Sequence, residues 1–194
     1  MKLTVVRQTD LIMTTHLIEV NMVKRIRQFM DNIGYGFQKI DDDFLSLYLN
    51  EKEQCLFGKL RKSEQIHSIL VAKDIRRELG ENRERDLIRA ALFHDIGKIV
   101  RPMNILEKST AVMLKRLLGR KIALLERSEM IQSYLYHGER GGEILKSEKI
   151  FEDAPLFYRL VSLHHQKREM IIKQNDSERL VSYYDLLKKY DDRY

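Results

Sequence analysis

Cysteine, proline and glycine are scarce in this chain of 194 residues, and tryptophan is absent. A single cysteine, Cys55, excludes an internal disulfide and makes a cytosolic compartment the default expectation. Two prolines and nine glycines, in a sequence that is 43% hydrophobic and 33% charged, exclude collagen-like, low-complexity and mostly disordered classes. No apolar run approaches the roughly 20 residues of a membrane-spanning helix, and the N-terminus lacks a signal-peptide core. These absences predict a helix-rich, soluble, cytoplasmic protein.

Positive charge outweighs negative charge by a small margin, with 35 basic residues, 29 acidic residues and a formal net charge of +6. Most of the excess lies in residues 101–127, where seven basic residues accompany two acidic ones. Charge runs are usually solvated helix surface, but such a run can also form a basic wall beside an anion site. Both interpretations stay open for these seven residues, which are Arg101, Lys108, Lys115, Arg116, Arg120, Lys121 and Arg127.

Hydrophobic periodicity predicts an all-α fold. Apolar residues recur at steps of three and four along most of the chain, which is the period of an amphipathic helix, and alternating strand-like patterns are scarce. Capping residues, glycine and proline mark several helix ends, and we predict a bundle of about eight or nine helices. The most clearly marked helices are expected at 15–34, 43–49, 63–80, 82–93, 153–164 and 180–187.

The chemical motifs lie after residue 60. Residues 1–60 carry only one histidine, His16, and no recognisable motif, which is typical of a helical extension packed on a functional domain. No internal repeat, low-complexity block or proline-rich linker interrupts the chain. We therefore predict a helical N-terminal extension at 1–60 and a functional domain at 61–194.

One stretch combines a pair of metal ligands with a glycine and a lysine. His94 and Asp95 directly follow an apolar run and precede Ile96, Gly97 and Lys98. An imidazole next to a carboxylate offers a nitrogen ligand beside an oxygen ligand that can bridge two cations. Gly97 lets the backbone leave the helix tightly, and Lys98 offers a positive charge near a metal. A His-Asp pair alone is common by chance, so this interpretation depends on further ligands.

Four other segments carry candidate ligands. His67 lies on a predicted helix, and His137 opens a glycine-rich run in which small residues permit close approach of the backbone. His164 and His165 end an apolar helix, and because neighbours on a helix point about 100° apart, both can bind one ion only where the helix frays. Asp185 interrupts the apolar stripe of the last helix, where an unpaired carboxylate would be costly.

The order of these elements resembles the HD-domain metal-dependent phosphohydrolases, in the branch whose central motif reads His-Asp-Ile-Gly-Lys. The resemblance covers about residues 60–190 and implies an all-α HD-domain helical bundle. Gly141, four residues after His137, also matches, whereas Gly138 stands where proline is usual and Gln166 where glutamate commonly follows the histidine pair. These two departures concern the subfamily and not the fold. The resemblance rests on five separated elements, which are His67, His94-Asp95, His137, His164-His165 and Asp185.

The resemblance also implies a centre with two divalent metal ions. A water or hydroxide between the ions would be the nucleophile, and iron, manganese, zinc, cobalt and nickel all suit nitrogen and oxygen ligands. Asp95 and Lys98 are the implied catalytic residues, with Lys98 neutralising charge on the phosphoryl group. Lys98, Arg101 and Arg140 are the implied substrate contacts. The implied ligands of one ion are His67, His94, Asp95 and Asp185, and those of the second are the bridging Asp95, His137, His164 and His165.

The expected function is hydrolysis of a phosphate ester or anhydride in a nucleotide or a related small molecule. Nucleoside monophosphates, dinucleoside polyphosphates and cyclic dinucleotides are candidate substrates, but residues 166–170 lack the Gly-Tyr-Pro signature of the branch that cleaves cyclic di-GMP. Two alternatives stay open, a di-iron oxygenase of the same fold and a nucleotide-sensing binding module. The expected partner is the small phosphorylated substrate, without membrane or nucleic acid, and a homo-oligomer stays open.

Overall fold

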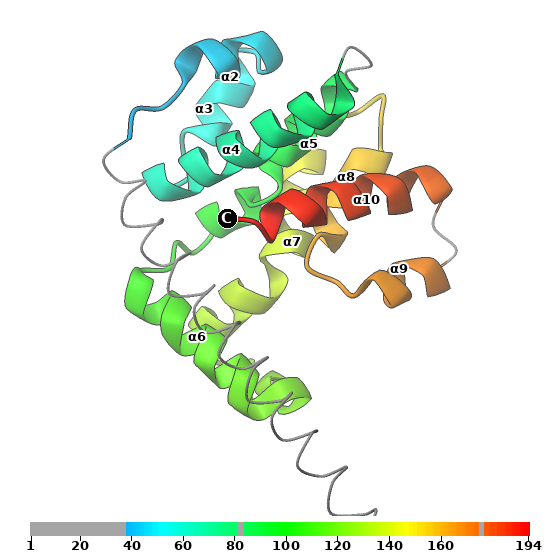
Figure 1. Ribbon diagram of the computed structural model, residues 1–194. Helices are drawn as coiled ribbons and strands as arrows, with labels where there is room; N and C mark the ends of the chain where they lie inside the picture. The colour runs from blue at the N-terminus through cyan, green and yellow to red at the C-terminus, as the bar shows by residue number, and fades with distance from the viewer. Residues whose placement is uncertain (1–37, 81–83, 175–176) are drawn as a thin grey trace, which may run out of the picture. The chain divides into compact units, whose positions relative to one another are not determined.

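The computed structural model describes residues 38–80, 84–174 and 177–194, and these ranges contain nine α-helices, two 3₁₀ helices and no strand (Figure 1). The prediction of an all-α fold is confirmed. The helix expected at 15–34, with His16, lies outside the described residues. No helix within the described ranges combines the length and the apolar character needed to cross a bilayer. The elements in chain order are α2 (Asp42–Tyr48), α3 (Glu51–Phe57), α4 (Lys62–Leu79), α5 (Arg85–Phe93), η1 (Ile96–Ile99), α6 (Ile105–Leu118), η2 (Gly119–Leu125), α7 (Glu129–Ser147), α8 (Leu156–Leu163), α9 (Arg168–Lys173) and α10 (Glu178–Asp191).

Polar side chains at the helix starts satisfy backbone N–H groups that have no partner within the helix. The Asp41 carboxylate accepts a hydrogen bond from the Phe44 N–H at 2.9 Å, so α2 is capped by Asp41 and begins one residue before the expected start. Asn50 and Asn104 each form a capping box with a glutamate three residues later, at the starts of α3 and α6. The other expected helices correspond, with ends shifted by a few residues, to α4, α5, α8 and α10.

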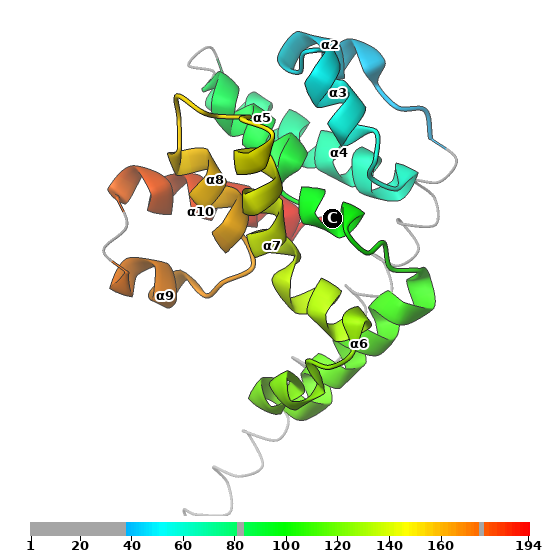
Figure 2. The same ribbon diagram turned by 180° about the vertical axis from the view of Figure 1, so that it is seen from behind.

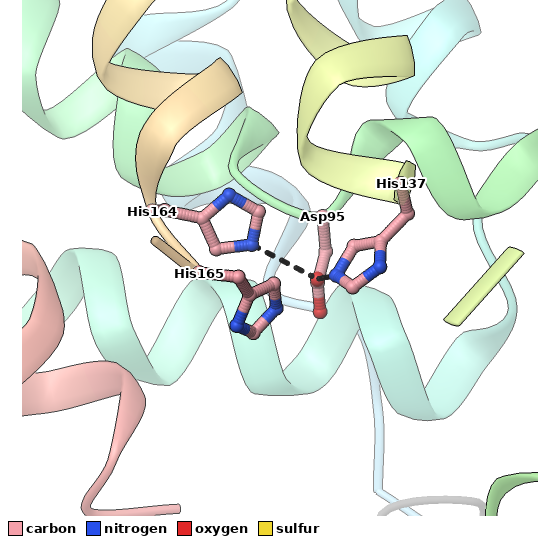
Figure 3. A group of neighbouring side chains, drawn as sticks. All are labelled: Asp95, His137, His164 and His165. Carbon is pink, nitrogen blue, oxygen red and sulfur yellow. Dashed lines mark ion pairs between the residues drawn. The ribbon is translucent and has the colours of Figure 1, made fainter. Parts of the chain in front are cut away.

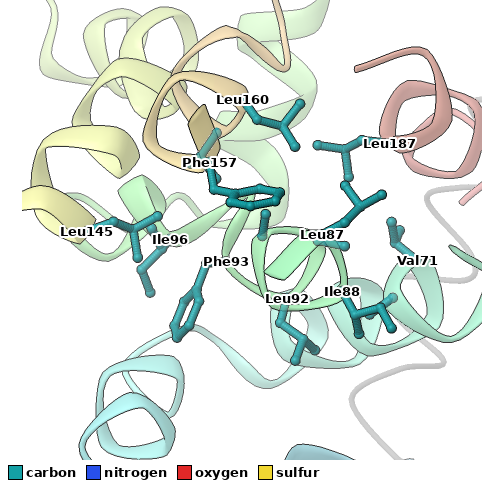
Figure 4. Close-up of a cluster of buried hydrophobic side chains, with 14 of the residues drawn as sticks. Val71, Leu87, Ile88, Leu92, Phe93, Ile96, Leu145, Phe157, Leu160 and Leu187 are labelled. Carbon is teal, nitrogen blue, oxygen red and sulfur yellow. The ribbon is translucent and has the colours of Figure 1, made fainter. Parts of the chain in front are cut away.

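Helix α5 lies within the main hydrophobic core and packs against α4 and α8 (Figure 4). Leu87, Ile88, Leu92 and Phe93 lie on different sides of this helix, and all four are completely buried. The last turn of α5, residues 90–93, is enclosed on all sides and is apolar all round, whereas the charged residues of the first two turns reach the surface. This buried apolar run before His94 therefore carries the His-Asp pair into the interior.

Helices α2 and α3 belong to the same core. Phe44, Leu45 and Phe57 are buried in it, and the rings of Phe57 and Phe93 meet edge to face with their centroids 6.2 Å apart. Residues 39–194 form one compact unit. Helices α2 and α3 therefore supply part of the core around α5.

Glycines allow α7 to pack directly against η1 and α8. A Cβ atom at Gly97 would lie 1.8 Å from the carbonyl oxygen of His137, and a Cβ atom at Gly142 would lie 1.9 Å from Ser162 Oγ. The backbone at Gly97 does not adopt a positive φ, so this residue provides space for α7 and not the expected tight exit from the helix. The close approach expected for the glycine-rich run is present, and it brings α7 against the His-Asp segment.

A second, smaller hydrophobic cluster joins α6 and η2 to α7. Met103, Ala111, Ile122 and Ile131 are buried in this cluster. Figures 1 and 2 show α6 lying beyond the main core, next to the start of α7. The position of α6 matters because it carries several residues of the basic segment.

Candidate metal centre

Four side chains from distant segments meet at the end of α5. Asp95 follows α5, His137 lies on α7, and His164 and His165 follow α8 (Figure 3). One potential ligand atom of each residue lies within 4.8 Å of the others. Asp95 Oδ1 is 3.5 Å from His137 Nε2 and 3.7 Å from His164 Nε2, distances that exceed those of ordinary hydrogen bonds. The structure therefore gathers four of the expected ligands, which we call the first group, around one carboxylate.

The end of α8 explains how two consecutive histidines reach the first group. The helix ends at Leu163, so His164 is its C-cap and His165 lies beyond the regular helix. The ring centroids of His164 and His165 are 4.0 Å apart, and those of His165 and His137 are 4.4 Å apart. The loss of regular helix that both rings need in order to face one ion is thus present in the structure.

Backbone carbonyl groups orient three histidine rings. A carbonyl oxygen can only accept a hydrogen bond, so the Nδ1 atom facing it carries the proton and Nε2 keeps a free lone pair. Metal-binding histidines are commonly oriented in this way. The Nδ1 bonds run from His94 to the Ala91 oxygen at 2.8 Å, from His137 to the Ser133 and Tyr134 oxygens at 3.2 and 3.1 Å, and from His164 to the Val161 oxygen at 2.6 Å.

The inward-facing ligand atoms are buried and have no hydrogen-bond partner. They are Nε2 of His94, His137 and His164 and Oδ1 of Asp95. Unpaired buried polar atoms are rare and costly, so four of them in one place fit a cation that would bind them. An ion with bonds of about 2.1 Å sets its ligands roughly 3.0 to 3.5 Å apart, close to the separations around Asp95. These residues therefore fit a divalent metal ion.

A second group lies on the other side of the Asp95 carboxylate. His67 on α4, His94 and Asp191 on α10 also place their ligand atoms within 4.8 Å of one another. Asp191 Oδ1 lies 3.1 Å from His67 Nε2 and 3.4 Å from His94 Nε2. Asp95 Oδ2 lies 3.6 Å from His94 Nε2, whereas Oδ1 faces the first group. One carboxylate thus has an oxygen toward each group, as a bridging ligand requires.

The structure corrects the expectation that Asp185 is a ligand. The Asp185 side chain is 42% exposed and accepts hydrogen bonds from Arg168 at 2.7 and 2.9 Å. Asp191 lies with the two histidines instead. Tyr184, Leu187 and Asp191 follow one another at steps of three and four on the inward face of α10, and Asp185 points about 100° away from Tyr184. The step from Leu187 to Asp191 places Asp191 on the inward face of α10, and the docking of that helix brings it to His67.

Replacement of Asp191 by asparagine should remove one metal ion, whereas replacement of Asp185 by asparagine should remove none. Asp191→Asn removes the only carboxylate that α10 contributes to the second group, so we expect at least about tenfold weaker metal binding by that group. Asp185→Asn is the matched control on the same helix, since it breaks only an exposed ion pair. Elemental analysis after dialysis measures the difference. Equal metal content in the two variants would place the ligand elsewhere.

The electrostatics of both groups favour a bound cation. Burial would raise the pKa of Asp95, but Lys98 and His94 hold that pKa well below its usual range. Burial lowers the pKa of His164 to about 4, so its ring is neutral at neutral pH and offers a lone pair. Burial also opposes the His94 cation, yet Asp95 and Asp191 raise its pKa. The ionised carboxylates therefore create a negative potential at the centre.

A cavity of about 320 Å³ adjoins the first group, a volume that suits a small ligand. His137 and His165 line this cavity, and so does Lys98, whose ammonium group contacts Asp95. Burial disfavours the Lys98 cation, but Asp95 and Glu64 raise its pKa, so the side chain stays charged. A ligand in the cavity would touch metal-centre residues and a fixed positive charge together.

The two arginines expected to contact substrate do not line this cavity. Arg101 forms ion pairs with two glutamates, at 2.7 and 3.7 Å, and Arg140 donates a hydrogen bond to the Gln132 side chain at 3.1 Å. Of the three expected substrate contacts, the structure places Lys98 alone in the cavity wall.

Comparison with protein families matches residues 65–189 to the HD domain. The match covers more than half of the chain and includes all the residues of both groups except Asp191. The match confirms the HD-domain family that the order of the motifs indicated. Searches of curated proteins and of solved structures found no match.

Proposed function

Because this chain belongs to the HD-domain family, we propose that it is a metal-dependent phosphohydrolase. HD domains bind divalent metal ions, and the family generally includes metal-dependent phosphohydrolases. The proposed substrate is a phosphate ester or anhydride of a nucleotide or a related small molecule, and the proposed location is the cytosol. The observation that carries the proposal is the convergence of four buried, unpaired ligand atoms, from His94, Asp95, His137 and His164.

Each group would hold one metal ion. Ions bound in this way lower the pKa of a water molecule and withdraw electrons from a phosphoryl oxygen, which is the chemistry of hydrolysis. Mixed nitrogen and oxygen ligands suit iron, manganese, zinc, cobalt or nickel. The ligands of one ion would be Asp95 Oδ1, His137, His164 and His165, and those of the other would be Asp95 Oδ2, His67, His94 and Asp191.

The protein's own residues would position the phosphoryl group and stabilise its charge. The cavity brings a ligand against His137 and His165, and Lys98 lies on the same wall beside Asp95. A fixed ammonium group in this position neutralises the negative charge that develops on phosphoryl oxygens in the transition state. The Nδ1 bond of His137 to the backbone prevents rotation of its ring, so the ligand atoms are already aligned before substrate binds.

Positive charge in the cavity favours hydrolysis of a phosphorylated substrate over the two alternatives. Lys98, Lys108 and Lys115 all line the wall, which suits an anionic ligand. A di-iron oxygenase does not require such a wall, and a sensing module does not require a complete set of metal ligands. The described residues contain two groups of side chains that could each hold an ion.

The test starts with elemental analysis of protein purified without chelator, followed by a panel of phosphate esters assayed with several divalent ions. We expect about two ions per chain, hydrolysis of at least one nucleotide, and loss of activity when the metal is removed. The same rate is expected without oxygen. Strictly oxygen-dependent turnover would support the di-iron alternative, and nucleotide binding without turnover by metal-loaded protein would support the sensing module. Either result overturns the proposal.

A further inference from the structure

Three lysines line the cavity beside the candidate metal centre. Lys98 lies on η1 and contacts Asp95, whereas Lys108 and Lys115 lie on α6. Residues seven apart on a helix lie on the same face, two turns and about 10 Å apart along the axis. Positive charge on the wall therefore extends well beyond the phosphoryl group that Lys98 can reach.

Lys115 has no acidic partner within the described ranges of the chain, in contrast to the other two lysines. Lys98 is paired with Asp95, and Lys108 is paired with Glu64 at 2.8 Å. The Glu64 side chain is only 4% exposed, so Lys108 neutralises a buried carboxylate. Lys115 is exposed and lines the cavity without such a role. It is therefore the cation that is available to a ligand.

The remainder of the wall combines Glu64, Ser133 and the two histidines with apolar and aromatic residues. Met103, Val112, Tyr134 and Leu135 line the cavity together with the lysines. Apolar and aromatic side chains suit the body of a small ligand, and a few charged groups fix its orientation. The wall as a whole matches a nucleoside that carries anionic groups at more than one position.

We infer that the substrate carries a second phosphoryl group, which does not react and which Lys115 binds. This inference rests on the proposed function and narrows the substrate to nucleotides with at least two phosphoryl groups. The scissile group lies at Asp95 beside Lys98, and a nucleoside monophosphate therefore leaves Lys115 without a ligand. Binding energy from a remote group contributes to selection between substrates without changing the reacting bond. Lys115 is thus a specificity residue.

The test compares AMP with ADP, ATP and adenosine 3′,5′-bisphosphate, using the metal-loaded protein. We expect at least one of the last three to exceed AMP in kcat/KM by about tenfold, the contribution of one charge-assisted contact. Lys115→Met should remove this advantage through a higher KM for the preferred nucleotide, and Lys115→Arg should retain it. Arg116→Met is the matched control, because Arg116 is the next residue on α6, exposed and outside the cavity wall.

The inference fails, with the hydrolase intact, if AMP is cleaved as efficiently as the other nucleotides. It also fails if Lys115→Met affects AMP and the preferred nucleotide equally, or if Lys115→Met and Arg116→Met behave alike. Equilibrium binding of AMP and adenosine 3′,5′-bisphosphate to metal-free protein shows whether the phosphate site exists even if the protein is not a hydrolase. Tighter, Lys115-dependent binding of the bisphosphate without hydrolysis of any nucleotide would reject the proposed function and leave the phosphate site standing, and absence of both results rejects both.

Discussion

Replacement of Asp95 by asparagine is expected to abolish metal binding and to lower the rate of hydrolysis by about a thousandfold or more. Asp95 directs Oδ1 toward His137 and His164 and Oδ2 toward His94, so one substitution weakens both metal groups. Asparagine keeps the shape of the side chain, but it removes the charge and one oxygen ligand. Substitution of His67, by contrast, affects the second group alone.

Metal content and kcat, measured on the same preparation, test this expectation. Asp95→Asn leaves Lys98 without its ion-pair partner, so thermal unfolding of the metal-free protein is recorded to show that the variant is folded. Asp185→Asn is the control for loss of an aspartate that forms an ion pair outside both groups, and it should keep both metal and activity. An Asp95→Asn protein that hydrolyses at the wild-type rate would reject the assignment of the centre.

Helices and most of the candidate ligands could be predicted because both depend on local patterns. Apolar residues at steps of three and four identify α4, α5 and α10 without knowledge of their neighbours. The residues from His94 to Lys98 are consecutive, so their position directly after α5 does not depend on how the other helices pack. The two charged residues of this run meet in the structure as an ion pair between Asp95 and Lys98.

Features that depend on packing between helices could not be predicted. Asp185 and Asp191 are both acidic residues on α10, and only the docking of that helix decides that Asp191 faces His67. The contact between Phe57 and Phe93 likewise joins segments far apart in the sequence, so local patterns could not predict that α3 packs against α5. In the basic segment, tertiary structure separates lysines that line the cavity from residues that remain on the surface.

Helix ends add a general electrostatic contribution to the centre. His94 is the C-cap of α5 and His164 is the C-cap of α8, so two helices end at the same place. The C-terminal end of a helix carries a partial negative charge, which adds to the charges of Asp95 and Asp191 in favouring a cation. The third helix, α7, must approach these ends closely for His137 to join them, and this approach depends on glycine.

A single methyl group added at Gly97 should therefore lower the free energy of unfolding by about 3 kcal/mol. The new Cβ would lie 1.8 Å from the His137 carbonyl oxygen and 2.7 Å from the Gly141 nitrogen. Both are backbone atoms of α7, so no side-chain rotation relieves the overlap and α7 must move away from η1. His137 would move with it, and metal binding by the first group should weaken together with stability.

Denaturant unfolding of the metal-free protein, with metal titration of the folded protein, measures both effects of Gly97→Ala. Gly58→Ala is the matched control, because Gly58 also has an ordinary helical backbone, with φ −62°, and its added Cβ would lie 3.3 Å from the Gln54 oxygen. The control should change stability by less than about 1 kcal/mol and leave metal binding unaltered. If the two variants unfold alike and bind metal alike, direct backbone contact between η1 and α7 does not hold His137 beside Asp95.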